Sequence, residues 1–205
     1  MIDNQGSEIT SIFNCINEDV LKLSYRWKIY LDLFDSGEAN LELLNSSGGC
    51  VFELVQYLIM DDTILALSRL TDPPKSGRDQ DNANIRYLLA LSKDVLNPSA
   101  VIDLNNALAR LDAHVKNLRV YRHKALAHSD LHHALRMVGL PDITYVEVEG
   151  AMEECRNIVS KLGAELLNQS CNFNVLIPFG YDASHLLTLL RKAHAQNEQS
   201  GTDHV

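Results

Sequence analysis

The chain has 205 residues, of which 46% are hydrophobic and 22% are charged, and its formal net charge is −9. This composition excludes a chain that is disordered throughout, and the length favours one domain with a single core. The longest apolar stretches, 54–60 and 63–67, are far shorter than the roughly 20 residues that a membrane span needs. The first seven residues show no signal-peptide pattern. We therefore expect a cytoplasmic protein without a membrane partner.

The four cysteines, Cys15, Cys50, Cys155 and Cys171, are widely spaced and form no Cys-x-x-Cys pair. This spacing argues against a zinc knuckle and against a thioredoxin-type redox site, so we expect reduced cysteines that pack in the fold. The acidic balance argues against a protein that coats nucleic acid through a generally basic surface. It is compatible with a local basic cleft.

Apolar residues recur at steps of three and four along most of the chain, which predicts helices. A short helical turn is expected over 38–44, and Ser46–Gly49 should break the chain before the next long helix. Asn97 and Pro98 give the clearest helix start, as N-cap and first helical residue. The helices are expected over 7–34, 50–70, 83–95, 98 to about 128, 147–167 and 183–195.

The segments between these helices are predicted to be loops. Residues 75–82 are polar, 143–146 form a short β-like piece, and 168–180 are irregular. The polar tail 196–205 is expected to be disordered. The fold class that follows is all-α, an up-and-down bundle of five to six helices in a single domain over residues 1–195.

The basic and titratable side chains concentrate in one stretch near the end of the fourth predicted helix. Between residues 110 and 136 the sequence has six Lys and Arg against two acids, a local charge of +4 in an acidic chain. The same stretch holds five of the eight histidines, His114, His123, His128, His132 and His133. Composition alone favours a solvated helix face whose charges have no specific role over a functional site.

The segment 121–130, YRHKALAHSD, resembles the Arg-polar-x(3 to 5)-His motif of HEPN domains. It follows a first helix with Trp27 and Phe34, the run DDTILALSRLTDP over 61–73, and Asn84, in that order. This order, over roughly residues 27–130, resembles the AbiU-like branch of abortive-infection HEPN proteins. The resemblance implies an HEPN-like helical bundle and a ribonuclease of the toxin or phage-defence type.

Cleavage of RNA without a metal needs a base, an acid and a cation that holds the phosphate oxygens. Histidine and arginine supply these groups. By the resemblance, Arg122 would hold the phosphate, His128 would act as base or acid, and His123 would fill the polar position after the arginine, which is Asn or Asp in many relatives. The nearby residues expected to bind substrate are Lys124, Arg119 and Lys116, and no cofactor is expected.

On an ideal helix Arg122 and His128 lie about 120° apart in azimuth and about 9 Å apart in rise. One helix therefore does not bring them onto one face. The resemblance implies that two such helices pair across a two-fold axis, so we expect a homodimer whose composite cleft binds RNA.

Other constellations leave alternatives open. His128 and His132 are spaced i, i+4 and can in principle hold a metal with Asp61 or Asp62, although we expect no metal site. Arg69 and Asp72 are expected to form a structural ion pair or to tie down the turn at Pro73 and Pro74.

Three aromatic residues stand out. Trp27 is expected to be core. Tyr87 and Tyr121 are candidates either for stacking on a base or for a packing role at the rim.

The sequence thus predicts a metal-independent endoribonuclease. The alternative is a non-catalytic HEPN module that binds RNA or takes part in a toxin–antitoxin interaction, with a cognate antitoxin as its partner.

Overall fold

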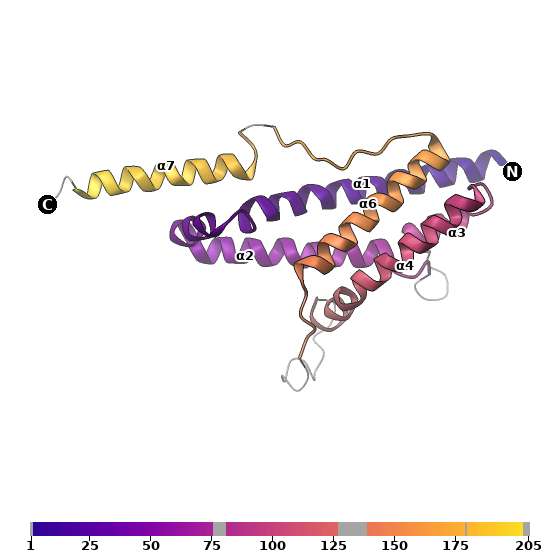
Figure 1. Ribbon diagram of the computed structural model, residues 1–205, viewed down its shortest axis with the longest axis horizontal. Coiled ribbons are helices and arrows are strands. Elements are labelled where there is room, and N and C mark those ends of the chain that lie inside the picture. Colours follow the sequence, from indigo (N-terminus) through magenta and orange to yellow (C-terminus); the bar gives the residue numbers. More distant parts are fainter. Residues whose placement is uncertain (1, 76–80, 127–138, 179, 203–205) are drawn as a thin grey trace. The chain divides into compact units, whose positions relative to one another are not determined.

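The computed structural model describes residues 2–75, 81–126, 139–178 and 180–202 (Figure 1). In these ranges the chain is all-α, with no strand, which confirms the predicted fold class. No helix in the described ranges is long and apolar enough to cross a membrane. The elements are α1 (Ile2–Phe34), α2 (Glu38–Thr71), α3 (Ile85–Ser92), α4 (Pro98–Tyr121), the π-helical turn η1 (Arg122–Leu126), α6 (Tyr145–Leu167) and α7 (Ala183–Thr202).

The contacts divide the chain into two compact units. Unit 1 comprises Met1–Leu23 and Thr63–Phe173, and unit 2 comprises Ser24–Asp62 and Asn174–Val205. The division falls within α1 and within α2, so each of these helices contributes residues to both units.

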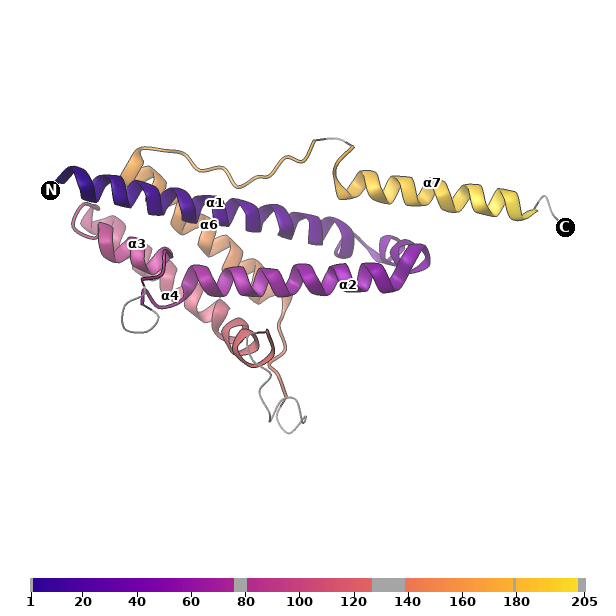
Figure 2. The same ribbon diagram turned by 180° about the vertical axis from the view of Figure 1, so that it is seen from behind.

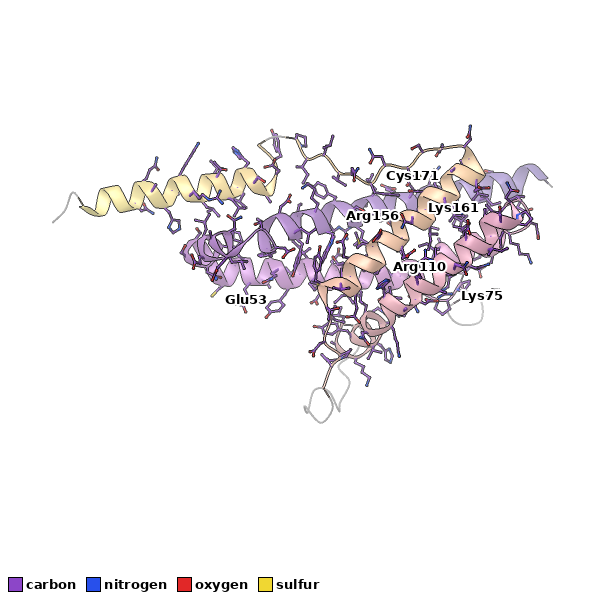
Figure 3. The ribbon with its side chains drawn as sticks, in the orientation of Figure 1. Glu53, Lys75, Arg110, Arg156, Lys161 and Cys171 are labelled. Atoms are coloured by element: carbon purple, nitrogen blue, oxygen red, sulfur yellow. The ribbon has the colours of Figure 1, made fainter. Side chains whose placement is uncertain are left out.

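Unit 1 is built around α4 and α6, which lie side by side in both views (Figures 1 and 2). Ion pairs join the two helices at the surface: Arg110 donates to Glu154, and Lys161 donates to Asp103. Figure 3 labels Arg110 on α4 and Lys161 on α6. The core side chains of unit 1 include Phe13, Ile16, Ile64, Leu67, Ile85, Leu88, Leu104, Leu111, Leu118, Met152 and Ile158.

The helix starts of unit 1 follow local hydrogen bonding. Asn97 precedes α4 with Pro98 at its first position, as predicted, but its side chain makes no capping hydrogen bond. Thr144 begins α6 with a capping box, in which its side chain accepts from the Glu147 backbone and the Glu147 side chain accepts from the Thr144 backbone. The prediction of a β-like piece over 143–146 is therefore wrong, because Tyr145 and Val146 already belong to α6.

Unit 2 has its own small core between the second part of α1, the first part of α2 and the start of α7. Trp27 is buried, as predicted, and its ring stacks on Tyr30 with 4.8 Å between ring centroids. Near the other end of α7, His194 lies 2.9 Å from the hydroxyl of Ser47. The buried side chains of this core are Leu33, Phe34, Leu44, Ala183 and Leu187.

Two features of unit 2 bear on the prediction. The segment 38–44 and the long helix after it both belong to α2, and Gly48 between them departs from helical angles (φ 158°, ψ 55°), which confirms the expected break. Helix α7 continues to Thr202, so it extends into the polar segment for which the sequence predicts disorder.

Candidate functional site

The Arg-His segment begins where α4 changes its winding. Helix α4 ends at Tyr121, and the five residues Arg122–Leu126 form a π-helical turn. The prediction of a regular α-helix to about residue 128 is therefore wrong for this turn, and ideal-helix angles do not describe it. A π turn has i→i+5 hydrogen bonds and occurs mostly as a single turn, frequently at functional sites.

Arg122 forms an ion pair with Asp72, which directly follows α2. The Nη1 atom of Arg122 lies 2.6 Å from Oδ2 of Asp72, and their side chains are 26% and 22% exposed. The partner of Asp72 is thus Arg122 from a distant part of the sequence, and the predicted pairing with Arg69 is not what the structure shows. The pair joins the turn after α2 to the π turn after α4.

Asn84 fixes the backbone on which Asp72 sits. Its side-chain nitrogen donates to the Asp72 carbonyl at 2.9 Å, and its side-chain oxygen accepts from the Tyr87 backbone at 3.0 Å. One buried side chain therefore caps α3 and holds the chain leaving α2. Tyr87 itself lies 3.4 Å from Glu8 through its hydroxyl.

Two more arginines bind the last carbonyl of α2. Arg86 donates to the Thr71 carbonyl at 3.0 Å, and Arg119 donates to the same oxygen. Both arginines also pair with Asp112. Guanidinium groups at this place stabilise α2, because the helix C-terminus carries partial negative charge. Arg119, predicted to bind substrate, is thus held by a carbonyl and a carboxylate.

The other predicted site residues differ in their surroundings. His123 and Lys116 are exposed, and Lys124 is half-buried. The structure therefore places Arg122, His123 and Lys124 together on one π turn, with Arg119 on the preceding helical turn. His128, His132 and His133 lie outside the described residues, as does most of the segment between η1 and α6.

His114 belongs to the histidine-rich stretch of the sequence, but its side chain lies between α4 and α6. Its ring packs against the backbone of Gly150 on α6, where an added Cβ would lie 2.6 Å from its Nδ1 atom. The pKa of Glu147 is lowered, mainly by the backbone hydrogen bond from Thr144 and to a smaller extent by the electrostatic influence of His114. His114 is therefore an interhelical packing residue.

Carboxylates from other parts of the chain reduce the positive charge of the basic stretch. Asp72 pairs with Arg122, and Glu154 pairs with Arg110, yet neither acid lies within residues 110–136. The local charge of +4 counted along the sequence is therefore larger than the charge that a phosphate would meet in space.

The carboxylates considered as metal ligands do not gather at one site. Asp62 is paired with Arg26, and burial raises the pKa of Asp61. In the described ranges no group of three His, Cys, Asp or Glu side chains is placed to hold a metal ion. An open hollow of about 260 Å³ lies beside Asp72, and its lining includes Asp19, Asp81 and Arg69. Three carboxylates against one guanidinium disfavour an anion there.

The comparison with known protein families adds to this geometry. The AbiU2 profile of HEPN domains matches residues 6–186. The chain belongs to this family. The match confirms the resemblance seen in the sequence, and its range includes Arg122 and Asp72. Searches of curated proteins and of solved structures find no match.

Two residues that build this part of the AbiU2 domain are not predicted by the sequence. From the sequence, Asp112 is only an acid within the basic stretch, and Asn84 is only one member of the family pattern. For Asn84 a signal was present, because Asn directly before an apolar helical segment is a typical N-cap. No local signal identifies Asp112 as the partner of Arg86, since the two residues lie on different helices.

Proposed function

We propose that this AbiU2-family protein is a metal-independent endoribonuclease of the toxin or phage-defence type, which cleaves single-stranded RNA or exposed loops in the cytoplasm. The observation that carries the proposal is the exposure and the ion pairing of Arg122. Its guanidinium is partly exposed on a π turn and is oriented by Asp72 at 2.6 Å. Such a guanidinium can meet a phosphate with a defined orientation, because arginine binds phosphate through two parallel hydrogen bonds.

The proposed reaction uses the 2′-hydroxyl of the RNA as nucleophile. A base removes its proton while the 2′-oxygen attacks phosphorus, the bond from phosphorus to the 5′-oxygen breaks, and an acid protonates that oxygen. The products are a 2′,3′-cyclic phosphate and a 5′-hydroxyl. His128 serves as one of the two proton carriers, and Arg122 stabilises the charge on the phosphate oxygens.

The neighbouring side chains have supporting roles in this proposal. His123, exposed on the same turn, contacts the phosphate or supplies the second proton carrier. Lys116 and Lys124 bind the RNA backbone. Arg119 contributes through its positive field, because its guanidinium is bound to Thr71 and Asp112.

We also propose that the active form is a homodimer and that residues 1–195 form one HEPN-like domain. The dimer would bring Arg122 and His128 of two subunits to one cleft across a two-fold axis. The family match over residues 6–186 supports the single domain, because it runs through both units. A monomeric mass by light scattering at micromolar concentration would contradict the dimer.

The test is incubation of the wild type, His128→Ala and Arg122→Ala with a labelled RNA pool. Loss of His128 should slow cleavage by roughly 10² to 10⁴-fold, the usual contribution of general acid–base catalysis. Loss of Arg122 should slow it by roughly 10² to 10³-fold, as for removal of an oxyanion donor. Arg110→Ala is the matched control, since Arg110 is an ion-paired arginine on the preceding helix and should leave the rate unchanged.

Several results would contradict the proposal. Cleavage of DNA and RNA alike excludes a 2′-hydroxyl mechanism, and loss of activity in EDTA excludes a metal-independent one. Unchanged cleavage by a folded His128→Ala protein, with native circular dichroism, would remove the proposed site.

The second candidate is a non-catalytic HEPN module that binds RNA or an antitoxin. The observation in its favour is that Arg119 and Arg122 are both paired with carboxylates, as purely structural arginines are. This candidate predicts RNA binding or partner binding without cleavage. Poor cell growth on expression that His128→Ala relieves would favour the nuclease instead.

A further inference from the structure

The second part of α2 is apolar on its solvent side as well as on its core side. Phe52, Val55 and Ile59 pack against the core of unit 2. On an adjacent, solvent-facing side of the helix lie Val51, Leu54, Tyr57 and Leu58, which are 64%, 58%, 61% and 58% exposed. A wide apolar face on a helix is normally buried against another element. This face is therefore exposed to solvent, although its apolar composition is typical of a buried surface.

The four exposed side chains form one surface, which we call the α2 stripe (Val51, Leu54, Tyr57 and Leu58). Val51, Leu54 and Leu58 follow each other at steps of three and four, so they line one side of the helix, and Tyr57 flanks them. Single exposed apolar residues are ordinary on a protein surface, but a contiguous group of large ones marks an interaction site.

The surroundings of the α2 stripe are acidic. No Lys or Arg occurs between residues 29 and 62, and unit 2 as a whole has ten acidic and four basic residues. Glu53 lies on the same part of α2 (Figure 3). Asp61 follows Leu58 by three residues, and burial raises the pKa of its carboxyl group.

The acidic surroundings favour some binding partners of the α2 stripe over others. A second copy docked by the same face would bring Glu53 and Asp61 close to identical acids, with no lysine or arginine on the helix segment to offset them. An anionic membrane surface is disfavoured for the same reason. A helix that carries an apolar stripe flanked by Lys or Arg matches both the apolar surface and its acidic rim.

We propose that the α2 stripe docks a basic amphipathic helix of another protein. Leu54 and Leu58 provide the apolar contact at its centre, as in helix-in-groove recognition through residues spaced i, i+3, i+4 and i+7. Glu53 and Asp61 accept hydrogen bonds from the basic side chains at the rim, which steer the encounter and make it sensitive to salt. This inference is independent of the proposed nuclease activity, since it uses none of the residues around Arg122.

The test uses the full chain and a synthetic amphipathic helix of about 18 residues, or five turns, with leucines on one face and lysines on the other. An otherwise identical peptide with glutamates in place of the lysines is the control probe. Fluorescence anisotropy should give a dissociation constant on the order of micromolar for the basic peptide, an affinity that weakens as salt is added.

Two variants locate the binding on the surface. Leu54→Ser with Leu58→Ser should weaken binding by at least about tenfold, since two apolar anchors are lost. Ile102→Ser is the matched control, because Ile102 is 62% exposed on α4, and it should bind the peptide like the wild type. Circular dichroism of both variants checks that the fold is kept, as expected for exposed positions.

Four outcomes would overturn the proposal. The first is that the basic peptide does not bind up to about 100 µM, a range that covers weak complexes. The second is that the acidic peptide binds equally well, and the third is that the serine double variant binds like the wild type. The fourth is a dimer in light scattering, or binding to phosphatidylserine vesicles, that the double variant abolishes. That result would assign the α2 stripe to a second copy or to a lipid surface.

Discussion

Asp72 and Arg122, fifty residues apart in the sequence, form an ion pair with 2.6 Å between Oδ2 and Nη1. The two residues belong to the two sequence segments that carry the family resemblance, the run 61–73 and the Arg-His segment. The pair therefore links the two segments directly, because Asp72 of the first holds the arginine of the second. Asn84, the third part of the pattern, fixes the backbone of Asp72.

The first prediction is that Asp72 and Arg122 are coupled energetically. Because both side chains are mostly buried, a double-mutant cycle with Asp72→Asn and Arg122→Gln should give a coupling free energy of about 1 to 2 kcal/mol in urea unfolding. The matched control is the exposed pair Glu18 and Lys22 on α1, for which about 0.3 to 0.5 kcal/mol is expected. Equal coupling in the two cycles would contradict the positioning role of Asp72.

The second prediction concerns the contact between His114 and Gly150. A Cβ at position 150 would lie 2.6 Å from Nδ1 of His114, so Gly150→Ala should lower the free energy of unfolding by about 1 to 3 kcal/mol. In a His114→Ala background the same change should raise it by up to about 1 kcal/mol, since alanine favours a helix over glycine. Thermal unfolding of the four proteins measures both effects. Destabilisation of equal size in both backgrounds would show that the ring is not the obstacle.

The third prediction concerns the capping box of α6. Thr144→Ala should destabilise the protein by about 1 kcal/mol, because the Glu147 backbone N–H loses its acceptor. Chemical unfolding at pH 7 provides the measurement. Thr188→Ala is the control, since its exposed hydroxyl donates to the Ser184 carbonyl within α7, and a loss as large there would argue against a specific cap.

The fourth prediction is a pH dependence from Glu147. Hydrogen bonds from Thr144 lower the pKa of Glu147 below its ordinary value of 4.5 in the folded state. Its contribution to stability is therefore fully present above pH 4.5 and is lost as the pH falls through the lowered folded-state pKa. The stability difference between the wild type and Glu147→Gln should shrink over that range. A difference that stays constant down to the acid transition would contradict the capping role of the carboxylate.

The fifth prediction concerns thiol reactivity. Burial raises the pKa of Cys155 to about 12, whereas Cys15 and Cys50 are exposed. Because the thiolate is the reactive form, Cys155 should resist alkylation at pH 8 in the folded protein, while Cys15 and Cys50 react. Mass spectrometry of iodoacetamide-treated protein, with and without denaturant, distinguishes the sites. Early labelling of Cys155 in native buffer would contradict its burial.

The sequence by itself determined the fold class and most helix positions of this protein. Apolar spacing along one helix is a local property, so the end of α1 at Phe34 and the start of α4 at Pro98 were predicted correctly. The core position of Trp27 and the break near Gly48 followed from residue type. The family, too, was recognisable, because its pattern is a fixed order of residues along the chain.

Only the tertiary structure determined which partners bind the arginines of the candidate site. The partner of Arg122 is Asp72 instead of a neighbour on its own helix, and Arg119 is held by Thr71 and Asp112. These contacts join elements that are distant in sequence, and the charge of a stretch cannot reveal which remote carboxylates will neutralise it. The π turn at Arg122 was equally hidden, because helix periodicity predicts continuation and the contacts of the fold determine where the winding changes.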